Sequence, residues 1–244
     1  METLKYLVKQ ISLVALLLAG ILMLWEIPHY HQNAMSHSDA VPMLGNKLPS
    51  YEIQTFLRHI DTRLPYYREE FQEAEKKTGV PWTLLAAVAY QESKWNRHAV
   101  SPTGVRGLMM LTRSTASELG IQNRLDPAKS ISGGARYLSH LHKRVPSEIR
   151  MPDRMFMALA AYNVGFGHMK DARLLAERLG KDSTKWDDLK QVLPLLSKKE
   201  YYEDLPHRYA RGSEPVQYVK RIRAYRKILQ QIIVQESKSP QVEV

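Results

Sequence analysis

An acidic residue on a face made otherwise of apolar residues is the first feature of this sequence that could do chemistry. Glu92 falls at helical spacing from Leu85, Val88 and Trp95, so a helix here would hold its carboxyl on the buried side. Burial raises the pKa of a carboxyl, which suits a general acid that protonates a leaving oxygen near neutral pH. A glutamate on such a face can also lie at its rim, in solvent or paired with an arginine. Spacing alone leaves both interpretations open.

Helices are the elements that must position this carboxyl. Pro81 fits the first position of the helix that carries Glu92, and no strand-like alternation occurs in the sequence. The sequence therefore predicts a mainly α fold. The later helices are expected to start at Thr112, at Asp126 with Pro127, at Asp153 as a cap, and near Ser213. They are expected to stop at Gly120, at the pair Gly165 and Gly167, and at Gly180.

The last expected helix, which begins near Ser213, has one apolar and one basic side. Its apolar residues predict a buried face, and the basic stripe is interpreted as a solvated face. The apolar side carries Tyr218, Val219, Ile222, Tyr225, Leu229 and Ile232, and the basic side carries Lys220, Arg221, Arg223, Arg226 and Lys227.

The N-terminal segment is typical of an export signal. Lys5 and Lys9 precede an almost purely apolar run over residues 11–25. Residues 1–27 are expected to form an uncleaved membrane-anchor helix, with a cleaved signal as the alternative, because small residues of a cleavage site do not follow the run. Lys5 and Lys9 are expected to stay cytoplasmic, which places everything after Glu26 on the far side of the membrane. Residues 28–50 are polar and proline-rich, which predicts a tether.

Composition narrows the possible partners. The net charge is +10, which favours an anionic partner: nucleic acid, a lipid surface or an acidic polymer. The absence of cysteine excludes disulfides and thiolate metal sites. His29, His31 and His37 lie in the tether without carboxylates at ligand spacing, so they are interpreted as solvated. No metal and no organic cofactor is expected.

Three ordered motifs then resemble a known family. They are the run Tyr90-Gln91-Glu92-Ser93, the loop over residues 101–110, and Ala161-Tyr162-Asn163-Val164-Gly165. Together they resemble the catalytic domain of the soluble lytic transglycosylase superfamily, and most closely the membrane-bound lytic murein transglycosylase F group. The likeness covers about residues 66–231, within an expected domain of residues 51–235 followed by a tail over residues 236–244.

The resemblance implies a lysozyme-like helical domain that cleaves the linkage between N-acetylmuramic acid and N-acetylglucosamine in peptidoglycan glycan strands and leaves a 1,6-anhydro sugar. It assigns Glu92 as acid and then base, with no second carboxylate and with the substrate's N-acetyl group assisting. It implies that Ser101 holds the acetamido region, that Tyr162 lies near Glu92, and that Asn163 and Glu214 contact substrate. Without the resemblance, Ser101, Tyr162 and Asn163 are ordinary turn, core and helix-end residues.

Two departures from the broader superfamily stand out. The loop reads Gly107-Leu108-Met109-Met110 where the superfamily usually has glutamine last, so Met110 implies different groove contacts. The F group resembles this chain in having methionine there. Its members also carry a solute-binding-like domain before the catalytic one, where this chain has only the expected anchor and tether.

Other functions remain open at this point. A hydrolytic muramidase would want a second carboxylate, for which Glu118 and Asp126 are weak candidates. A weakly active peptidoglycan-binding scaffold is a further alternative. Nucleic-acid binding is disfavoured, because an exported chain without a recognised binding motif has little access to nucleic acid.

Overall fold

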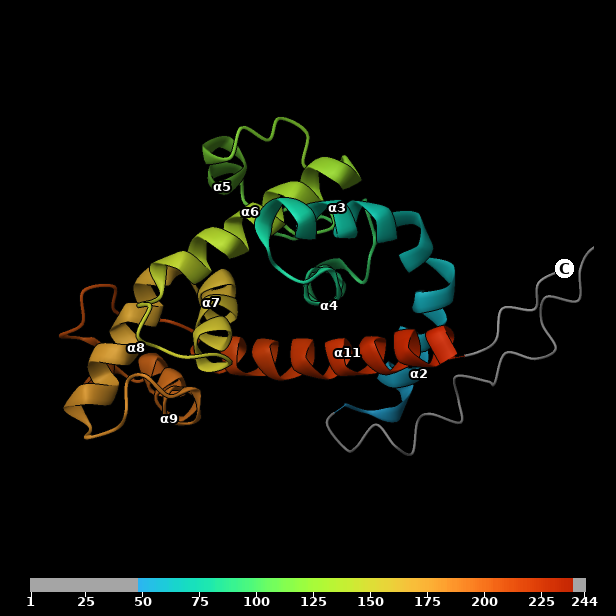
Figure 1. Ribbon diagram of the computed structural model, residues 1–244. Helices are drawn as coiled ribbons and strands as arrows, with labels where there is room; N and C mark the ends of the chain where they lie inside the picture. Colours follow the sequence, from blue (N-terminus) through green and yellow to red (C-terminus); the bar gives the residue numbers. More distant parts are fainter. Residues whose placement is uncertain (1–47, 239–244) are drawn as a thin grey trace, which may run out of the picture. The chain divides into compact units, whose positions relative to one another are not determined.

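The computed structural model describes residues 48–238, which fold as helices joined by loops (Figure 1). The described residues form no strand, only the isolated bridges Val100–Arg106 and Arg106–Leu111. The expectation of a mainly α fold is confirmed. The helices are α2 (Ser50–Thr62), the 3-10 helix η2 (Leu64–Tyr67), α3 (Arg68–Thr78), α4 (Trp82–Ser93), α5 (Arg113–Glu118), α6 (Pro127–Arg144), α7 (Asp153–Val164), α8 (Phe166–Arg178), α9 (Trp186–Val192), the 3-10 helix η3 (Leu193–Ser197), α10 (Lys199–Tyr202) and α11 (Ser213–Lys238).

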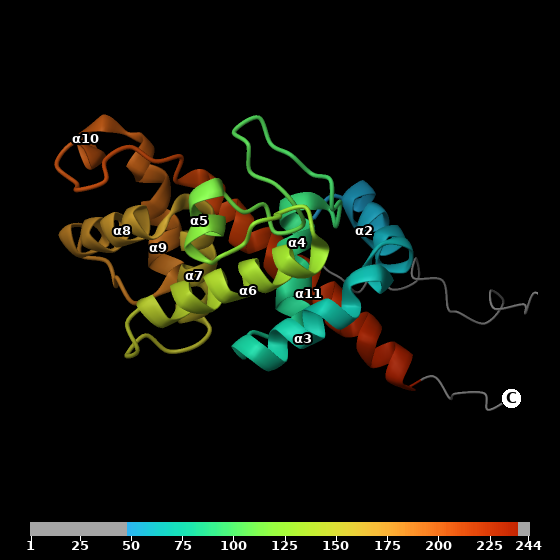
Figure 2. The same ribbon diagram turned by 90° about the horizontal axis from the view of Figure 1, so that it is seen from above.

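Helix α4 lies at the centre of the core. Every residue from Thr83 to Tyr90 is buried, so other elements cover this stretch on all sides. Helices α3 and α11 pack along it, and Figure 2 shows α4 enclosed among its neighbours. Leu85 and Val88 are fully buried, which stabilises the fold by about 1.5–3 kcal/mol for each side chain. Glu92 lies in the last turn of this central helix.

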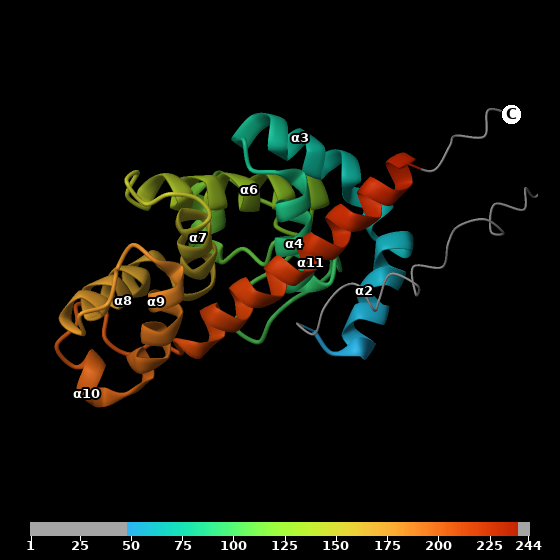
Figure 3. The same cartoon turned by 60° about the horizontal axis from the view of Figure 1, so that its bottom comes forward.

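The long helix α11 packs against both α4 and α7 (Figure 3). It begins at Ser213, as predicted, and its apolar side is buried. The basic side is solvated in part: Lys220, Arg223 and Lys227 are exposed, as predicted, whereas Arg221 and Arg226 are half-buried. Arg221 donates from Nε to Gln91 and pairs with buried Glu52, Arg223 lies 4.4 Å over the Phe156 ring, and Arg226 approaches Thr83.

The predicted helix caps were right at two places. Thr112 accepts from the backbone of Thr115, and Asp126 accepts from Lys129 with Pro127 as the first helical residue. Asp153 was wrongly assigned as a cap. It is the first residue of α7, and its carboxylate accepts instead from the backbone N–H of Trp186, which ties α9 to α7.

Two further helix ends differ from expectation. Gly165 does end α7, but α8 begins at the next residue and contains Gly167. Helix α4 ends at Ser93, and both Lys94 and Trp95 have positive φ, so Trp95 lies beyond the helix that was expected to carry it. The indole N–H of Trp95 donates to the carbonyl of Ala86, which holds the segment after α4 against that helix.

Several expectations fall on the ends of the chain. The expected anchor and the tether histidines lie outside the described residues, and no helix within residues 48–238 is long and apolar enough to cross a membrane. Helix α2 begins at Ser50, the last residue of the expected tether, and α11 continues to Lys238, beyond the expected domain end at residue 235.

Candidate active site

Glu92 lies in the last turn of α4 and is half-buried. The hydroxyl of Tyr218, on α11, donates a 2.6 Å hydrogen bond to its Oε1 atom. Burial raises the pKa of Glu92 from 4.5 to about 7, and the Tyr218 hydrogen bond opposes part of that rise. A carboxyl with this pKa is populated in both the acid and the base form near neutral pH. Within residues 48–238, no charged side chain contributes to the shift of the Glu92 pKa.

Three tyrosines line up beside this carboxyl. The rings of Tyr162 and Tyr218 are stacked with centroids 6.5 Å apart and an interplanar angle of 12°, and the centroid of the Tyr137 ring lies 5.3 Å from that of Tyr162. Burial and the nearby Glu92 charge raise the pKa of both Tyr162 and Tyr218 well above the usual value. Both phenols therefore keep their protons and can serve as hydrogen-bond donors.

The loop over residues 101–111 is fastened to the helices below it. Ser93, next to Glu92, donates from Oγ to the carbonyl of Leu108 at 2.9 Å. The backbone N–H of Met109 donates to Ser130 Oγ on α6 at 3.1 Å, and its carbonyl accepts from Tyr162 at 2.8 Å. Tyr162 thus makes two contacts: its hydroxyl bonds to the loop, and its ring stacks on the ring of Tyr218. The loop therefore lies beside the three tyrosines.

A second set of contacts shapes the outer part of the loop. Arg124 donates from Nη1 to the carbonyls of Gly104 and Leu111, at 2.9 and 2.8 Å. Gly107 has a φ of +83°, and a Cβ built on it would lie 1.8 Å from the carbonyl oxygen of Arg124. Only glycine fits there, because both the backbone conformation and the space exclude a side chain.

Ser101 and Met110 stand at the two ends of this loop. Ser101 Oγ accepts from the backbone of Val105 at 3.2 Å and lies 2.9 Å from Thr103 Oγ1, so the serine serves as a turn residue in this structure. Met110 is half-buried and has a φ of +46°, an unusual backbone conformation for a residue with a side chain.

The remaining expected site residues lie further out. Asn163 is exposed in the last turn of α7. Glu214 is exposed in the first turn of α11 and pairs with Arg211 at 3.3 Å. Glu214 precedes Tyr218 by one turn of the same helix, so it shares that side of α11. The structure therefore brings Tyr162 close to Glu92 through Tyr218, and leaves Asn163 and Glu214 as surface residues of neighbouring elements.

Sequence reasoning missed the role of Tyr218. It was grouped with the apolar side of α11, although a phenol on a buried helix face needs a hydrogen-bond partner. That requirement was the available signal, but it does not say which group the partner is.

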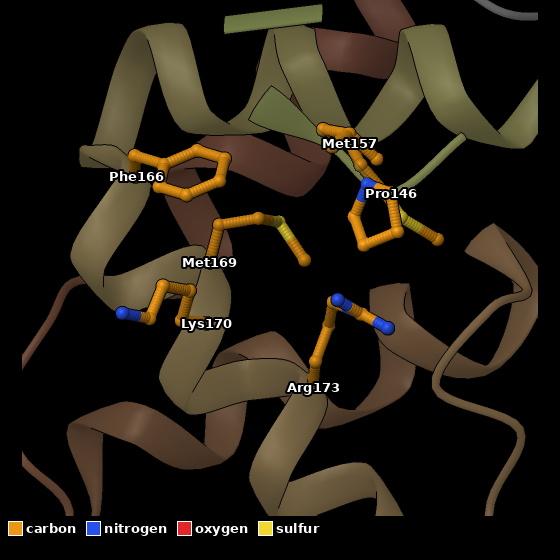
Figure 4. A pocket seen from close by; sticks show the side chains of 7 residues that line it. Pro146, Met157, Phe166, Met169, Lys170 and Arg173 are labelled. Atoms are coloured by element: carbon orange, nitrogen blue, oxygen red, sulfur yellow. The ribbon is translucent and has the colours of Figure 1, made fainter. Parts of the chain in front are cut away.

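A hollow between α6, α7 and α8 lies apart from these residues (Figure 4). Its volume is only about 10 Å³, which is less than a small ligand needs. Its lining has two cations but no carboxylate, hydroxyl or imidazole, so acid–base chemistry belongs to the region of Glu92. The lining residues are Val145, Pro146, Met157, Phe166, Met169, Lys170 and Arg173.

The comparison with protein families identifies the part of the chain that carries this site. Residues 69–184 match the model of the family described as transglycosylase SLT domain. The match includes Glu92, the loop over residues 101–110, and Tyr162. Residues 69–184 belong to the transglycosylase SLT domain family. Tyr218 and Glu214 lie beyond the matched part of this SLT domain, on α11.

Curated relatives extend the likeness beyond the SLT domain. The chain is 55% identical over 179 residues to a membrane-bound lytic murein transglycosylase F of Marinobacter nauticus, which covers 73% of this chain and 36% of the relative. It is 57% identical over 178 residues to one of Maricaulis maris, covering 73% and 39%. With membrane-bound lytic murein transglycosylase F 2 of Alkalilimnicola ehrlichii it is 48% identical over 206 residues, covering 82% and 46%. The chain thus spans less than half the length of these relatives.

A solved structure shares the fold. The crystal structure of the 70 kDa soluble lytic transglycosylase of Escherichia coli aligns with a TM-score of 0.51 and 23% identity, over 68% of this chain and 24% of that one. The lysozyme-like helical architecture expected from the sequence agrees with this likeness.

Proposed function

We propose that this chain is a peptidoglycan lytic transglycosylase, which cleaves the β-1,4 linkage from N-acetylmuramic acid to N-acetylglucosamine without water and leaves 1,6-anhydro ends. The SLT family membership and the names of the relatives support this activity. The observation that carries the proposal is the state of Glu92: one half-buried carboxyl with a pKa of about 7, hydrogen-bonded by a phenol.

The reaction needs one group to act twice. Protonated Glu92 gives its proton to the glycosidic oxygen as the bond to C1 of the muramic acid breaks, and the N-acetyl group of that sugar stabilises the positive charge at C1. The Glu92 carboxylate then takes the proton from the C6 hydroxyl, whose oxygen bonds to C1 and closes the anhydro ring. Glu92 ends protonated again, and no water is consumed.

Tyr218 suits this double role. Its hydroxyl can donate to the Glu92 carboxylate at 2.6 Å, so the charge formed after the first proton transfer is stabilised without full solvation. The raised pKa of Tyr218 keeps its proton in place throughout. A hydrogen bond from a phenol thereby limits the rise of the Glu92 pKa to a useful range.

The other expected site residues are assigned to substrate binding. Ser101 and Met110, at the ends of the fastened loop, would contact the acetamido region and the sugar ring. Tyr162 would face the sugar beside Glu92, and Asn163 and Glu214 would contact more distant parts of the glycan strand. Met110 replaces the amide contact of a glutamine with an apolar one.

The hydrolytic alternative has less support from geometry. Asp126 is occupied as the cap of α6, where it accepts from the backbone of Lys129 at 2.9 Å. Glu118 is exposed, and its charge is felt by Tyr137 but does not contribute to the pKa of Glu92. A weakly active scaffold has no specific contact in its favour.

Product mass tests the proposal. The full chain in non-ionic detergent is incubated with purified peptidoglycan, beside its Glu92→Gln variant, and the released muropeptides are weighed by mass spectrometry. Anhydro-muropeptides from the wild type and none from Glu92→Gln are expected. Products heavier by one water would establish a hydrolase, and no release from either protein would favour the scaffold.

We further propose the layout that the sequence suggests: an anchor over residues 1–27, a tether over residues 28–50, and the catalytic domain in the periplasm. The relatives' description as membrane-bound supports this placement. The intact protein should keep its N-terminus and remain in the membrane fraction. A mature chain that begins within the tether would refute the anchor.

A further inference from the structure

A basic hollow lies between α9 and α11, and the proposed reaction does not use it. Its volume is about 210 Å³, and five residues line it. Trp186 and Val216 supply apolar surface, while Lys190, Lys220 and Arg223 supply three positive charges from two different helices. The hollow therefore combines a small apolar wall with convergent cations.

The hollow is separate from the site of Glu92. Val216, Lys220 and Arg223 follow one another on α11 at spacings of four and three residues, so they form one stripe. Tyr218, which contacts Glu92, is two residues from Val216 and from Lys220, and about 100° per residue puts it on the other side of the helix. A ligand in the hollow would thus leave the carboxyl of Glu92 free.

The geometry of the hollow is held by its neighbours. The Arg223 guanidinium lies 4.4 Å from the centroid of the Phe156 ring, and that ring meets Trp186 edge-on at 6.2 Å. The backbone of Trp186 is fixed by its 2.9 Å hydrogen bond to Asp153. These contacts orient one planar cation and one aromatic wall before any ligand arrives, which lowers the entropic cost of binding.

The charges in the hollow are not balanced within the described residues. Lys190 pairs with Asp187 at 2.6 Å, and Arg223 lowers the pKa of the same carboxyl. Within residues 48–238, neither Lys220 nor Arg223 has an ion-pair partner within 4.0 Å. Asp187 and Asp153, whose carboxylate accepts from the backbone of Trp186, are the acids that these contacts place beside the hollow, and they face three cations, so an anion is favoured there.

We propose that this hollow binds the carboxylate groups of the peptide stems of peptidoglycan. This inference rests on the proposed function and names a second contact with the same substrate. A carboxylate matches the planar guanidinium of Arg223 in a bidentate pair, and the short apolar segments of an acidic amino acid match Trp186 and Val216. The volume is below the roughly 300–1,000 Å³ of pockets for drug-sized ligands, so the hollow fits one acidic residue. An inorganic phosphate group would use the cations but not the apolar wall.

A binding assay in a chain that cannot cleave tests this inference. The full chain in non-ionic detergent carries Glu92→Gln, with or without Lys220→Gln and Arg223→Gln together, and its binding to insoluble peptidoglycan is measured by sedimentation. Removing two charge-assisted contacts should weaken binding to intact peptidoglycan about tenfold. Binding to peptidoglycan stripped of its stems by an amidase should not change.

Controls separate this site from general charge. Lys227→Gln with Lys238→Gln removes two exposed cations of the same helix outside the hollow, and should leave binding unchanged. Lys220→Glu alone, on an exposed side chain, should reproduce the loss without disturbing Arg223 and Phe156. The free stem tripeptide should displace the parent chain, whereas inorganic phosphate at equal ionic strength should not.

The results that would overturn the inference are equally specific. They are equal losses from the hollow pair and the control pair, a loss that persists on stripped peptidoglycan, or displacement by phosphate as effective as by peptide. Because binding is read in a chain without Glu92, a wild type that releases no anhydro products would refute the proposed function and leave this readout unaffected.

Discussion

Tyr218 and Glu92 are 126 residues apart in the sequence, and the phenol of the first donates a 2.6 Å hydrogen bond to the carboxylate of the second. This bond opposes the effect of burial on the Glu92 pKa, which settles at about 7. In the proposed reaction, the two residues together would set the pH at which a single carboxyl acts as both acid and base.

Removing the Tyr218 hydroxyl should move the pH profile of the enzyme. kcat/KM is expected to fall above pH about 7 as Glu92 loses the proton needed for the first step. Tyr218→Phe removes the contact that favours the carboxylate, so this limb should shift upward by about one pH unit. The hydroxyl of Tyr162 bonds to the Met109 carbonyl and not to Glu92, so Tyr162→Phe should leave the limb in place. Equal shifts in both variants would contradict the role of Tyr218.

Glu92 should also make stability depend on pH. Its pKa is raised from 4.5 to about 7 by folding, so the folded state holds the proton more tightly. This contribution to stability is fully present below pH 4.5 and is lost as pH rises through about 7. Glu92→Gln should therefore be nearly neutral at pH 4 and should stabilise the protein by about 3 kcal/mol at pH 8.

Denaturant unfolding at the two pH values measures this difference. The exposed Glu118 provides the control, because Glu118→Gln should change stability little at either pH. A Glu92→Gln protein without added stability at pH 8 would show that the carboxyl is better solvated than its burial implies.

The two glycines of the loop should respond differently to alanine. At Gly107 the added Cβ would overlap the Arg124 carbonyl at 1.8 Å, whereas at Gly104, with a φ of +80°, nothing lies within 4 Å. Gly104→Ala should cost about 1 kcal/mol from backbone conformation alone, and Gly107→Ala at least about 3 kcal/mol. Thermal unfolding measures both, and similar losses would mean that the loop shifts freely.

Tyr162→Phe should loosen the same loop from the other side. The variant leaves the carbonyl of buried Met109 without its 2.8 Å partner, which should cost about 1–3 kcal/mol of unfolding free energy. Activity should fall with it, because the loop borders the proposed groove. Tyr137→Phe removes a hydroxyl from the neighbouring ring of the same row and should cost less. A larger effect at Tyr137 would overturn this ranking.

Chelation should leave the activity intact. The residues that the structure describes contain no group of three or more histidine, aspartate or glutamate side chains that could hold a metal ion. Activity measured before and after exhaustive treatment with EDTA should agree. A loss that is restored by one divalent ion would require a metal site and a different mechanism.

The features that sequence predicted well are local ones. Thr112 and Asp126 were recognisable as caps because the donor to each side chain lies three residues away. The recognition of Glu92 also began locally, from an acid on an apolar face. Tyr218 and Arg221 contact Glu92 and Gln91 on helix α4, more than a hundred residues away, and no spacing rule predicts such contacts.

The errors have the same origin. The basic stripe of α11 was interpreted as solvated because its periodicity shows only which residues share a face. Arg221 is half-buried because Glu52 of α2 pairs with it, whereas Lys220, Arg223 and Lys227 of the same stripe are exposed. Asp153 is similarly of a residue type that often caps helices, but its carboxylate accepts from the backbone N–H of Trp186, whose position depends on the tertiary fold.

Helix α2 has a consequence for how this protein can be divided. It lies before the stretch that matches the family, yet its Glu52 is buried and accepts hydrogen bonds from Tyr225 and Arg221 of α11. A piece trimmed to residue 69 would lose this acid and leave Arg221 and the neighbouring Lys94 without a negative charge inside the structure. A piece trimmed at the start of the family match should therefore be less stable than one that keeps α2, and a graft of this domain onto another protein should carry Glu52 with it.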